Sequence, residues 1–141
     1  RAKLRSQPEL IPNAVEEALR LTSPVQDLAR TTMREVEIDG VRIPAGKRVL
    51  LHYGSANRDE HEFGEDAHHF DVERKIDRIL SFTVGPHYCL GAAAARMQGR
   101  LVIEELLAAC PDFAVDAAAG VYAPGVHVRR FESLPFEAAS A

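Results

Sequence analysis

The sequence is poor in cysteine, and its two cysteines, Cys89 and Cys110, lie far apart. This spacing provides no disulfide framework and fits a cytoplasmic protein. An excess of positive charge is also lacking: the formal net charge is -4 at pH 7. Nucleic-acid binding, which would show as a basic patch, is therefore not supported. No run of about 18 apolar residues is present, so no membrane-spanning helix is predicted. Internal repeats and low-complexity linkers are absent as well.

The composition is that of an ordinary soluble protein, with 46% hydrophobic and 27% charged residues. A chain of 141 residues is long enough to form one domain with a hydrophobic core. It begins at Arg1 without the pattern of a signal peptide. The opening residues read like the middle of a longer chain, so the sequence leaves open whether a membrane anchor lies upstream of Arg1.

The chemistry of the sequence centres on Cys89, which follows a loop containing Gly85 and precedes Gly91. Residues 92–98 contain no glycine or proline and are strong helix formers. The cysteine therefore lies where a loop becomes a helix, and the free N–H groups and the helix dipole favour an anion there. We expect this thiol to ionise more easily than a free one, with His87 as a second cationic group. Redox, nucleophilic and metal-ligand roles all remain open, as does a cysteine packed as a small hydrophobe.

The full pattern around this cysteine is Phe-x-x-Gly-x-His-x-Cys-x-Gly, and it resembles the haem-ligand loop of the cytochrome P450 monooxygenases. Its positions are Phe82, Gly85, His87, Cys89 and Gly91. The resemblance implies that Cys89 is the thiolate axial ligand of haem b, iron protoporphyrin IX. Position 83 departs from the family pattern, because Thr83 stands where Gly or Ser is usual.

Residues 10–21 are predicted to form a helix, with Pro12 in its first turn and an apolar face. Glu17 and Arg20 are three residues apart on this helix and would ordinarily form a surface ion pair. The segment also resembles the family helix that carries a buried Glu-x-x-Arg pair. That resemblance implies a structural triad completed by Arg74, in which each charged group needs the others.

Residues 25–51 are predicted to be β-structure, because apolar and polar residues largely alternate and Asp39-Gly40 is a hairpin signal. Arg30 lies in this segment and could be a solvated strand residue. The resemblance instead implies that Arg30 pairs with one haem propionate and that His87 serves the other, since an arginine fork suits a carboxylate.

The family also implies a substrate pocket, formed by the segment that enters the small sheet and by the tip of a C-terminal hairpin. For Val25, Gln26 and Leu28 the alternative is plain strand packing. Gln26 would be an unusual polar residue of the pocket wall, able to orient a ligand. The candidates are Val25, Gln26, Leu28, His127 and Val128.

The remaining segments are predicted as follows. Residues 53–56 form a helical turn, and residues 60–81 form a long irregular loop whose histidines lack zinc-site spacing. A helix follows Cys89 to about residue 109 with an apolar face. Short strands occupy residues 113–116, 126–131 and 134–136, and residues 138–141 are a frayed end. The expected apolar face consists of Ala95, Val102, Leu106 and Leu107.

The predicted fold class is α+β, mainly α: the C-terminal part of the cytochrome P450 fold. Its expected parts are the Glu-x-x-Arg helix, small sheet, irregular meander, cysteine loop, following helix and terminal β-hairpins. Residues 1–141 would be the haem-binding portion of one larger domain, without the family's oxygen-activating helix.

The implied activity of the intact protein inserts one oxygen atom from O2 into a small apolar organic substrate. Electrons would come from NAD(P)H through a ferredoxin or flavoprotein donor. A peroxide-dependent haem-thiolate enzyme and a non-catalytic remnant remain alternatives. A thiol redox protein is a further one, although Cys89 has no resolving cysteine nearby.

Overall fold

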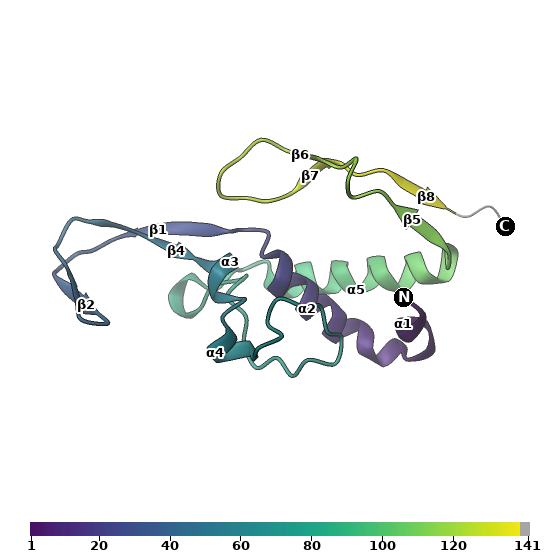
Figure 1. Cartoon of the computed structure of the whole chain (residues 1–141), viewed down its shortest axis with the longest axis horizontal. Coiled ribbons are helices and arrows are strands. Elements are labelled where there is room, and N and C mark those ends of the chain that lie inside the picture. Colours follow the sequence, from purple (N-terminus) through teal and green to yellow (C-terminus); the bar gives the residue numbers. More distant parts are fainter. Residues whose placement is uncertain (139–141) are drawn as a thin grey trace.

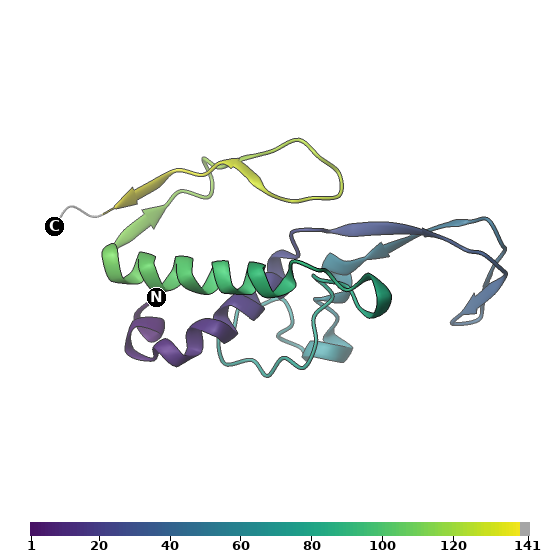
Figure 2. The same ribbon diagram turned by 180° about the vertical axis from the view of Figure 1, so that it is seen from behind.

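The computed structural model describes residues 1–138, in which two helices lie side by side at the centre of the molecule (Figures 1 and 2). These are α2 and α5, and the cysteine loop joins α5 at its N-terminal end. The helices and turns of 3₁₀ helix are α1 (Ala2–Ser6), η1 (Pro8–Leu10), α2 (Ile11–Thr22), α3 (Tyr53–Ala56), α4 (Glu60–Phe63), η2 (Gly85–His87) and α5 (Ala92–Ala109).

The strands form four separate two-stranded antiparallel ladders, β1 with β4, β2 with β3, β5 with β8 and β6 with β7. The β1–β4 ladder extends away from the helices with β2 near its far end, and the C-terminal strands return from the end of α5 (Figure 1). Their bounds are β1 (Asp27–Thr31), β2 (Val36–Ile38), β3 (Val41–Ile43), β4 (Arg48–His52), β5 (Phe113–Val115), β6 (Val121–Tyr122), β7 (Phe131–Ser133) and β8 (Phe136–Ala138).

Helix α2 forms where the sequence predicts it, one residue later at each end. Proline in the first turn costs no hydrogen bond, and Ile11, Ala14 and Val15 are buried on one face. The helix ends at Ser23, which takes a left-handed conformation at φ 38° and donates its N–H to the Leu19 carbonyl. This sharp end directs the chain from α2 into β1.

A small apolar cluster joins the base of the cysteine loop to both central helices. Ile79, Phe82 and Ala92 form its buried part, and Leu19 from α2 and Ala95 from α5 pack against it. Burial of Phe82 thus ties the start of the cysteine loop to α2 and α5.

Helix α5 has the predicted length, but its buried face differs from the expected one. Val102 is 64% exposed, so its assignment to the packed face was wrong. The contact with α2 instead uses small residues: a Cβ on Gly99 would lie 3.0 Å from Val15 Cγ1. Glycine at position 99 allows the two helices to approach closely there, while the side chain of Val102 stays exposed among residues 1–138.

The C-terminal region also departs from prediction. Residues 126–130 lie outside the strands, apart from a bridge between Val128 and Val25, and β6 was not predicted. Ala138 is not frayed, because it pairs with Phe113 in the β5–β8 ladder; residues 139–141 of the expected frayed end lie outside the described residues. Among residues 1–138, no helix has the length and apolar character needed to cross a membrane.

Candidate functional site

The cysteine loop is closed by main-chain hydrogen bonds at its base. Cys89 donates its N–H to the Phe82 carbonyl at 2.9 Å, and Ala92 donates to the Cys89 carbonyl at 3.2 Å. Between them, η2 forms a tight turn in which Tyr88 donates to the Gly85 carbonyl at 3.0 Å. Cys89 is an exposed free thiol that lies three residues before the start of α5. The loop therefore presents a sulfur atom at the surface from a fixed backbone.

Two loop residues take left-handed backbone conformations, Gly85 at φ 67° and Thr83 at φ 55°. A β-branched residue is strained there, whereas glycine is not. The Thr83 hydroxyl partly compensates by donating to the His87 carbonyl at 2.9 Å. Threonine at position 83 therefore strains the backbone, where glycine would not, but adds a hydrogen bond across the loop to the His87 carbonyl.

Arg30 and His87 line one cavity of about 350 Å³ between the β1–β4 ladder and the cysteine loop. Arg30 donates to the neighbouring Ala29 carbonyl at 3.0 Å, and neither Arg30 nor His87 forms an ion pair with another of residues 1–138. Apolar side chains complete much of the wall: Leu51, Leu80 and Val84. Two groups able to bind an anion thus meet at an otherwise mainly apolar cavity.

The three predicted triad residues are in direct contact. Glu17 and Arg20 are both 0% exposed, and their paired hydrogen bonds measure 2.6 and 2.8 Å. Arg74 Nε lies 3.1 Å from Glu17 Oε1, which also accepts the Asp71 N–H at 3.0 Å. Burial by itself raises the pKa of Glu17, but the hydrogen bonds from Arg20, Asp71 and Arg74 outweigh it and place the pKa below its usual value.

Arg20 and Arg74 also bind the main chain of the irregular segment. Arg20 donates to the carbonyls of Asn57 and Ala67 at 2.6 and 2.7 Å, and Arg74 donates to the Phe63 carbonyl at 2.7 Å. The Asp66 carboxylate, 2.9 Å away, raises the pKa of Arg74. Residues 57–74 lack regular structure beyond α4, and these contacts hold their backbone in place.

Sequence reasoning gave Asn57 no role, yet its side chain links α2 to the cysteine loop. Asn57 is 1% exposed and donates from Nδ2 to the hydroxyls of Ser23 and Ser81 at 2.8 and 3.0 Å. Its Oδ1 accepts the Leu80 N–H at 2.7 Å. The only sequence signal was the position of Asn57 in an Asn-Arg-Asp segment after the helical turn.

The family model described as Cytochrome P450 matches residues 2–112. The chain belongs to the cytochrome P450 family. Cytochrome P450 130 of Mycobacterium tuberculosis is 59% identical over 140 residues, covering 99% of this chain and 35% of that protein. Cytochrome P450 monooxygenase PikC of Streptomyces venezuelae is 39% identical, with 95% of this chain and 33% of that protein covered.

Solved cytochrome P450 structures share the fold over nearly the whole chain. P450BioI, in complex with an acyl carrier protein carrying hexadec-9Z-enoic acid, matches with a TM-score of 0.91 and 39% identity, covering 97% of this chain and 35% of that one. CYP109E1 of Bacillus megaterium, in complex with corticosterone, matches with a TM-score of 0.92 and 31% identity, covering 99% and 38%. The expected fold class is confirmed, and the chain spans about a third of the length of these cytochromes P450.

Cytochromes P450 bind haem b, and the residues of this chain fit that group. A soft thiolate ligand requires an exposed sulfur, which Cys89 provides. The two haem carboxylates accept hydrogen bonds, and two side chains able to donate them, Arg30 and His87, meet at one cavity. Gly91 lies directly beside the sulfur, because a Cβ at position 91 would be in ordinary van der Waals contact with the Cys89 sulfur at 3.8 Å.

The substrate-pocket candidates of this cytochrome P450 come from two segments that lie together. Val25 bridges Val128, and Gln26 donates its N–H to the His127 carbonyl at 2.7 Å. Two side chains are already engaged: Gln26 Nε2 donates to the Thr22 carbonyl at 2.9 Å, and His127 Nδ1 lies 2.5 Å from Asp27 Oδ1. Leu28 pairs with Leu51, a wall residue of the Arg30–His87 cavity. Substrate contact by all five residues stays a prediction.

Proposed function

We propose that the full-length protein is a haem-thiolate monooxygenase in which Cys89 is the axial ligand of the haem iron. One observation carries the proposal: the exposed Cys89 lies two residues after His87, which lines a cavity together with Arg30. An iron porphyrin with two carboxylates needs this combination of a soft ligand and anion-binding donors. Membership of the cytochrome P450 family supports it independently.

The predicted site residues have distinct parts in this proposal. Cys89 would supply a thiolate that donates electron density to the iron. Phe82, Gly85 and Gly91 would shape the loop around this ligand. Arg30 and His87 bind and orient the carboxylates of haem. Bound haem supplies the activation of O2, so that one oxygen atom enters an organic substrate and the other leaves as water. Glu17, Arg20 and Arg74 hold the irregular segment beneath the site.

For the substrate and the electron donor, the proposal names only a chemical class. We propose a small apolar organic substrate, as the family resemblance implies. Val25, Gln26, Leu28, His127 and Val128 would contact it. We propose that electrons come from NAD(P)H through a ferredoxin or a flavoprotein, as the family resemblance implies. The cytoplasmic location expected from the cysteine content stays a prediction.

Visible absorption of the reduced carbon monoxide complex tests the proposal in the full-length, haem-loaded protein. We expect the red-shifted band of thiolate-ligated haem in the wild type. Cys89→Ser should abolish this band, and Cys110→Ser should retain it, because the Cys110 thiol is engaged with the Asp112 carbonyl. An imidazole-type spectrum in the wild type would refute Cys89 as the ligand. Turnover with peroxide but not with a reductase would favour the peroxide-dependent alternative.

A further inference from the structure

Arg96 is a residue of α5 that contacts both ends of the cysteine loop, and the proposed function gives it no part. Its guanidinium carbon lies 4.6 Å from the centre of the Phe82 ring, at the start of the loop. Its Nη1 donates to the Tyr88 hydroxyl at 2.8 Å, and Tyr88 immediately precedes Cys89. One side chain therefore touches residues on both sides of the turn that presents the sulfur.

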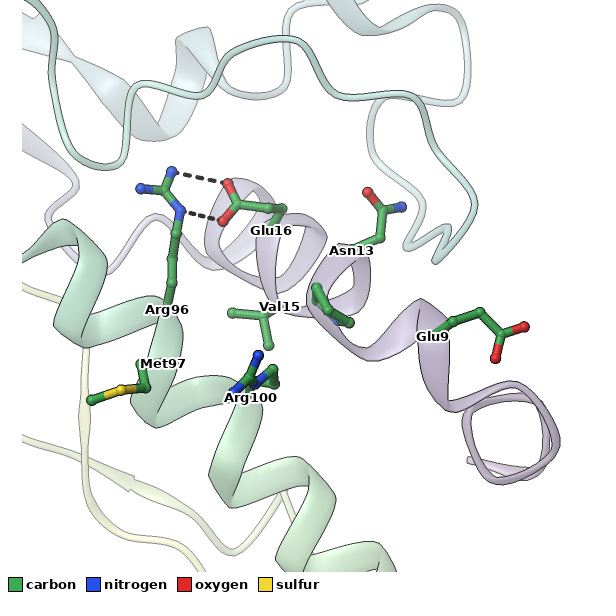
Figure 3. Close-up of a pocket in the computed structure, with 8 residues that line it drawn as sticks. Glu9, Asn13, Val15, Glu16, Arg96, Met97 and Arg100 are labelled. Atoms are coloured by element: carbon green, nitrogen blue, oxygen red, sulfur yellow. Dashed lines mark hydrogen bonds and ion pairs between the residues drawn. The ribbon is translucent and has the colours of Figure 1, made fainter.

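The guanidinium is itself held by Glu16 of α2. Figure 3 shows the two groups facing one another in a paired interaction, with Arg96 Nε and Nη2 donating to the two carboxylate oxygens; the Nη2 contact measures 3.0 Å. Because both side chains are partly buried, the pair is screened less than a surface pair. Donation of hydrogen bonds to the Glu16 carboxylate raises the pKa of Arg96, so the guanidinium stays charged.

The helices are not tightly packed beside this pair. A cavity of about 610 Å³ lies between α2 and α5, and the Arg96–Glu16 pair forms part of its wall (Figure 3). Close apolar contact is made one turn further along α5, where Gly99 meets Val15. The ion pair is thus a polar contact between α2 and α5, beside the apolar cluster at the base of the cysteine loop.

We propose that Arg96 and Tyr88 are positioning residues that fix the direction of the Cys89 sulfur and so tune its bond to the haem iron. The chain of contacts runs from Glu16 through Arg96 to the Tyr88 hydroxyl, next to the ligand. A second arm runs from Arg96 to Phe82, whose carbonyl accepts the Cys89 N–H at 2.9 Å. This inference rests on the proposed function, since it requires Cys89 to be the ligand.

Tyr88→Phe removes only the hydroxyl and is the decisive variant, and the chain offers a matched control. Tyr122 also accepts a hydrogen bond from an arginine, Arg129, at 2.9 Å, and that guanidinium carbon lies 5.0 Å from its ring. This second pair joins β6 to the segment before β7 in the C-terminal region. Tyr122→Phe therefore removes the same type of hydrogen bond away from the cysteine loop.

Two properties of the full-length, haem-loaded protein are measured: the haem reduction potential and the rate at which the carbon monoxide complex loses its red-shifted band. We expect Tyr88→Phe to shift the potential and to speed the loss about tenfold, the factor that corresponds to ~1.4 kcal/mol. Arg96→Lys keeps the charge but cannot make all three contacts, and it should have an effect at least as large. The melting temperature of Tyr88→Phe should match that of Tyr122→Phe.

The outcomes separate this inference from the proposed function. A wild type without the red-shifted band refutes Cys89 as the ligand, and the positioning role falls with it. A wild type with the band, but with an unchanged potential and rate in both Tyr88→Phe and Arg96→Lys, overturns the positioning role alone. Equal shifts in Tyr88→Phe and Tyr122→Phe overturn it as well, because the effect would then not be local to the loop.

Discussion

The side-chain amide of Asn57 donates to the Ser81 hydroxyl at 3.0 Å, and this contact joins the irregular segment to the start of the cysteine loop. Ser81 in turn donates to the Leu19 carbonyl of α2 at 2.7 Å. The adjacent Phe82 carbonyl accepts the Cys89 N–H. The buried Asn57 side chain is therefore connected to the proposed ligand, Cys89, through Ser81 and the adjacent Phe82 carbonyl.

Asn57→Ala should destabilise the fold and also disturb the haem ligand. The substitution leaves the Leu80 N–H without its acceptor, and each buried group left unpaired costs about 1–3 kcal/mol. Urea unfolding measures the stability, and the carbon monoxide spectrum measures the ligand. Asn13→Ala is the control, because Asn13 also donates to main-chain carbonyls, those of Val72 and Arg74. Asn13→Ala should lower stability without changing the spectrum; an identical spectrum in Asn57→Ala would contradict the proposed path.

Glu17→Gln should cost far more stability than a matched change at the surface. It leaves Arg20 buried with a neutral partner, and breaking a buried ion pair costs about 3–5 kcal/mol. Glu104→Gln removes the carboxylate from the exposed Arg100–Glu104 pair and should cost less than about 0.5 kcal/mol. Thermal unfolding of the two variants compares these losses. Similar losses would show that the buried triad contributes no more than a surface pair.

The lowered pKa of Glu17 predicts a loss of stability in acid. A carboxyl group whose pKa is lower in the folded state contributes fully above its usual pKa, 4.5, and loses that contribution as the pH falls toward the folded-state pKa. The free energy of unfolding should therefore decrease below about pH 4.5, and Glu17→Gln should flatten this decrease. Urea titrations at a series of pH values measure it. Parallel curves for the wild type and Glu17→Gln would disprove the assignment.

Substitutions at Thr83 separate backbone strain from the hydroxyl contact. Thr83→Gly removes a left-handed strain of about 1–2 kcal/mol and loses one hydrogen bond, so its stability should stay within about 1 kcal/mol of the wild type. Thr83→Val keeps the strain, loses the bond to the His87 carbonyl and should be less stable by about 1 kcal/mol. Differential scanning calorimetry ranks the variants. A less stable Thr83→Gly than Thr83→Val would mean that φ 55° is not strained here.

Local patterns in the sequence were sufficient for the main elements. Apolar spacing and Pro12 predicted α2, and the run without glycine or proline after Gly91 predicted the start of α5. The alternation at Val126 and Val128 was misleading, because Val128 pairs only through an isolated bridge to Val25, which lies before β1. A pattern of period two cannot distinguish a strand from such an isolated contact.

The site was predictable only in part. The spacing of the cysteine loop, together with the family resemblance, indicated the ligand, Arg30 and His87. The links from Asn57 to Ser23 and Ser81, and from Arg96 to Glu16, join residues 24 to 80 positions apart, and no local period or motif reports such pairs. Likewise, the pairing of His127 with Asp27 spans 100 residues. These contacts depend on how the segments pack, which the sequence pattern alone does not specify.

X-ray absorption at the iron edge of the full-length, haem-loaded protein tests the central assignment most directly, because it identifies the atoms bound to iron. We predict one sulfur atom in the first coordination shell together with the porphyrin nitrogens, and its loss in Cys89→Ser. A wild-type spectrum that contains only nitrogen and oxygen neighbours, or a sulfur neighbour that persists in Cys89→Ser, would contradict it.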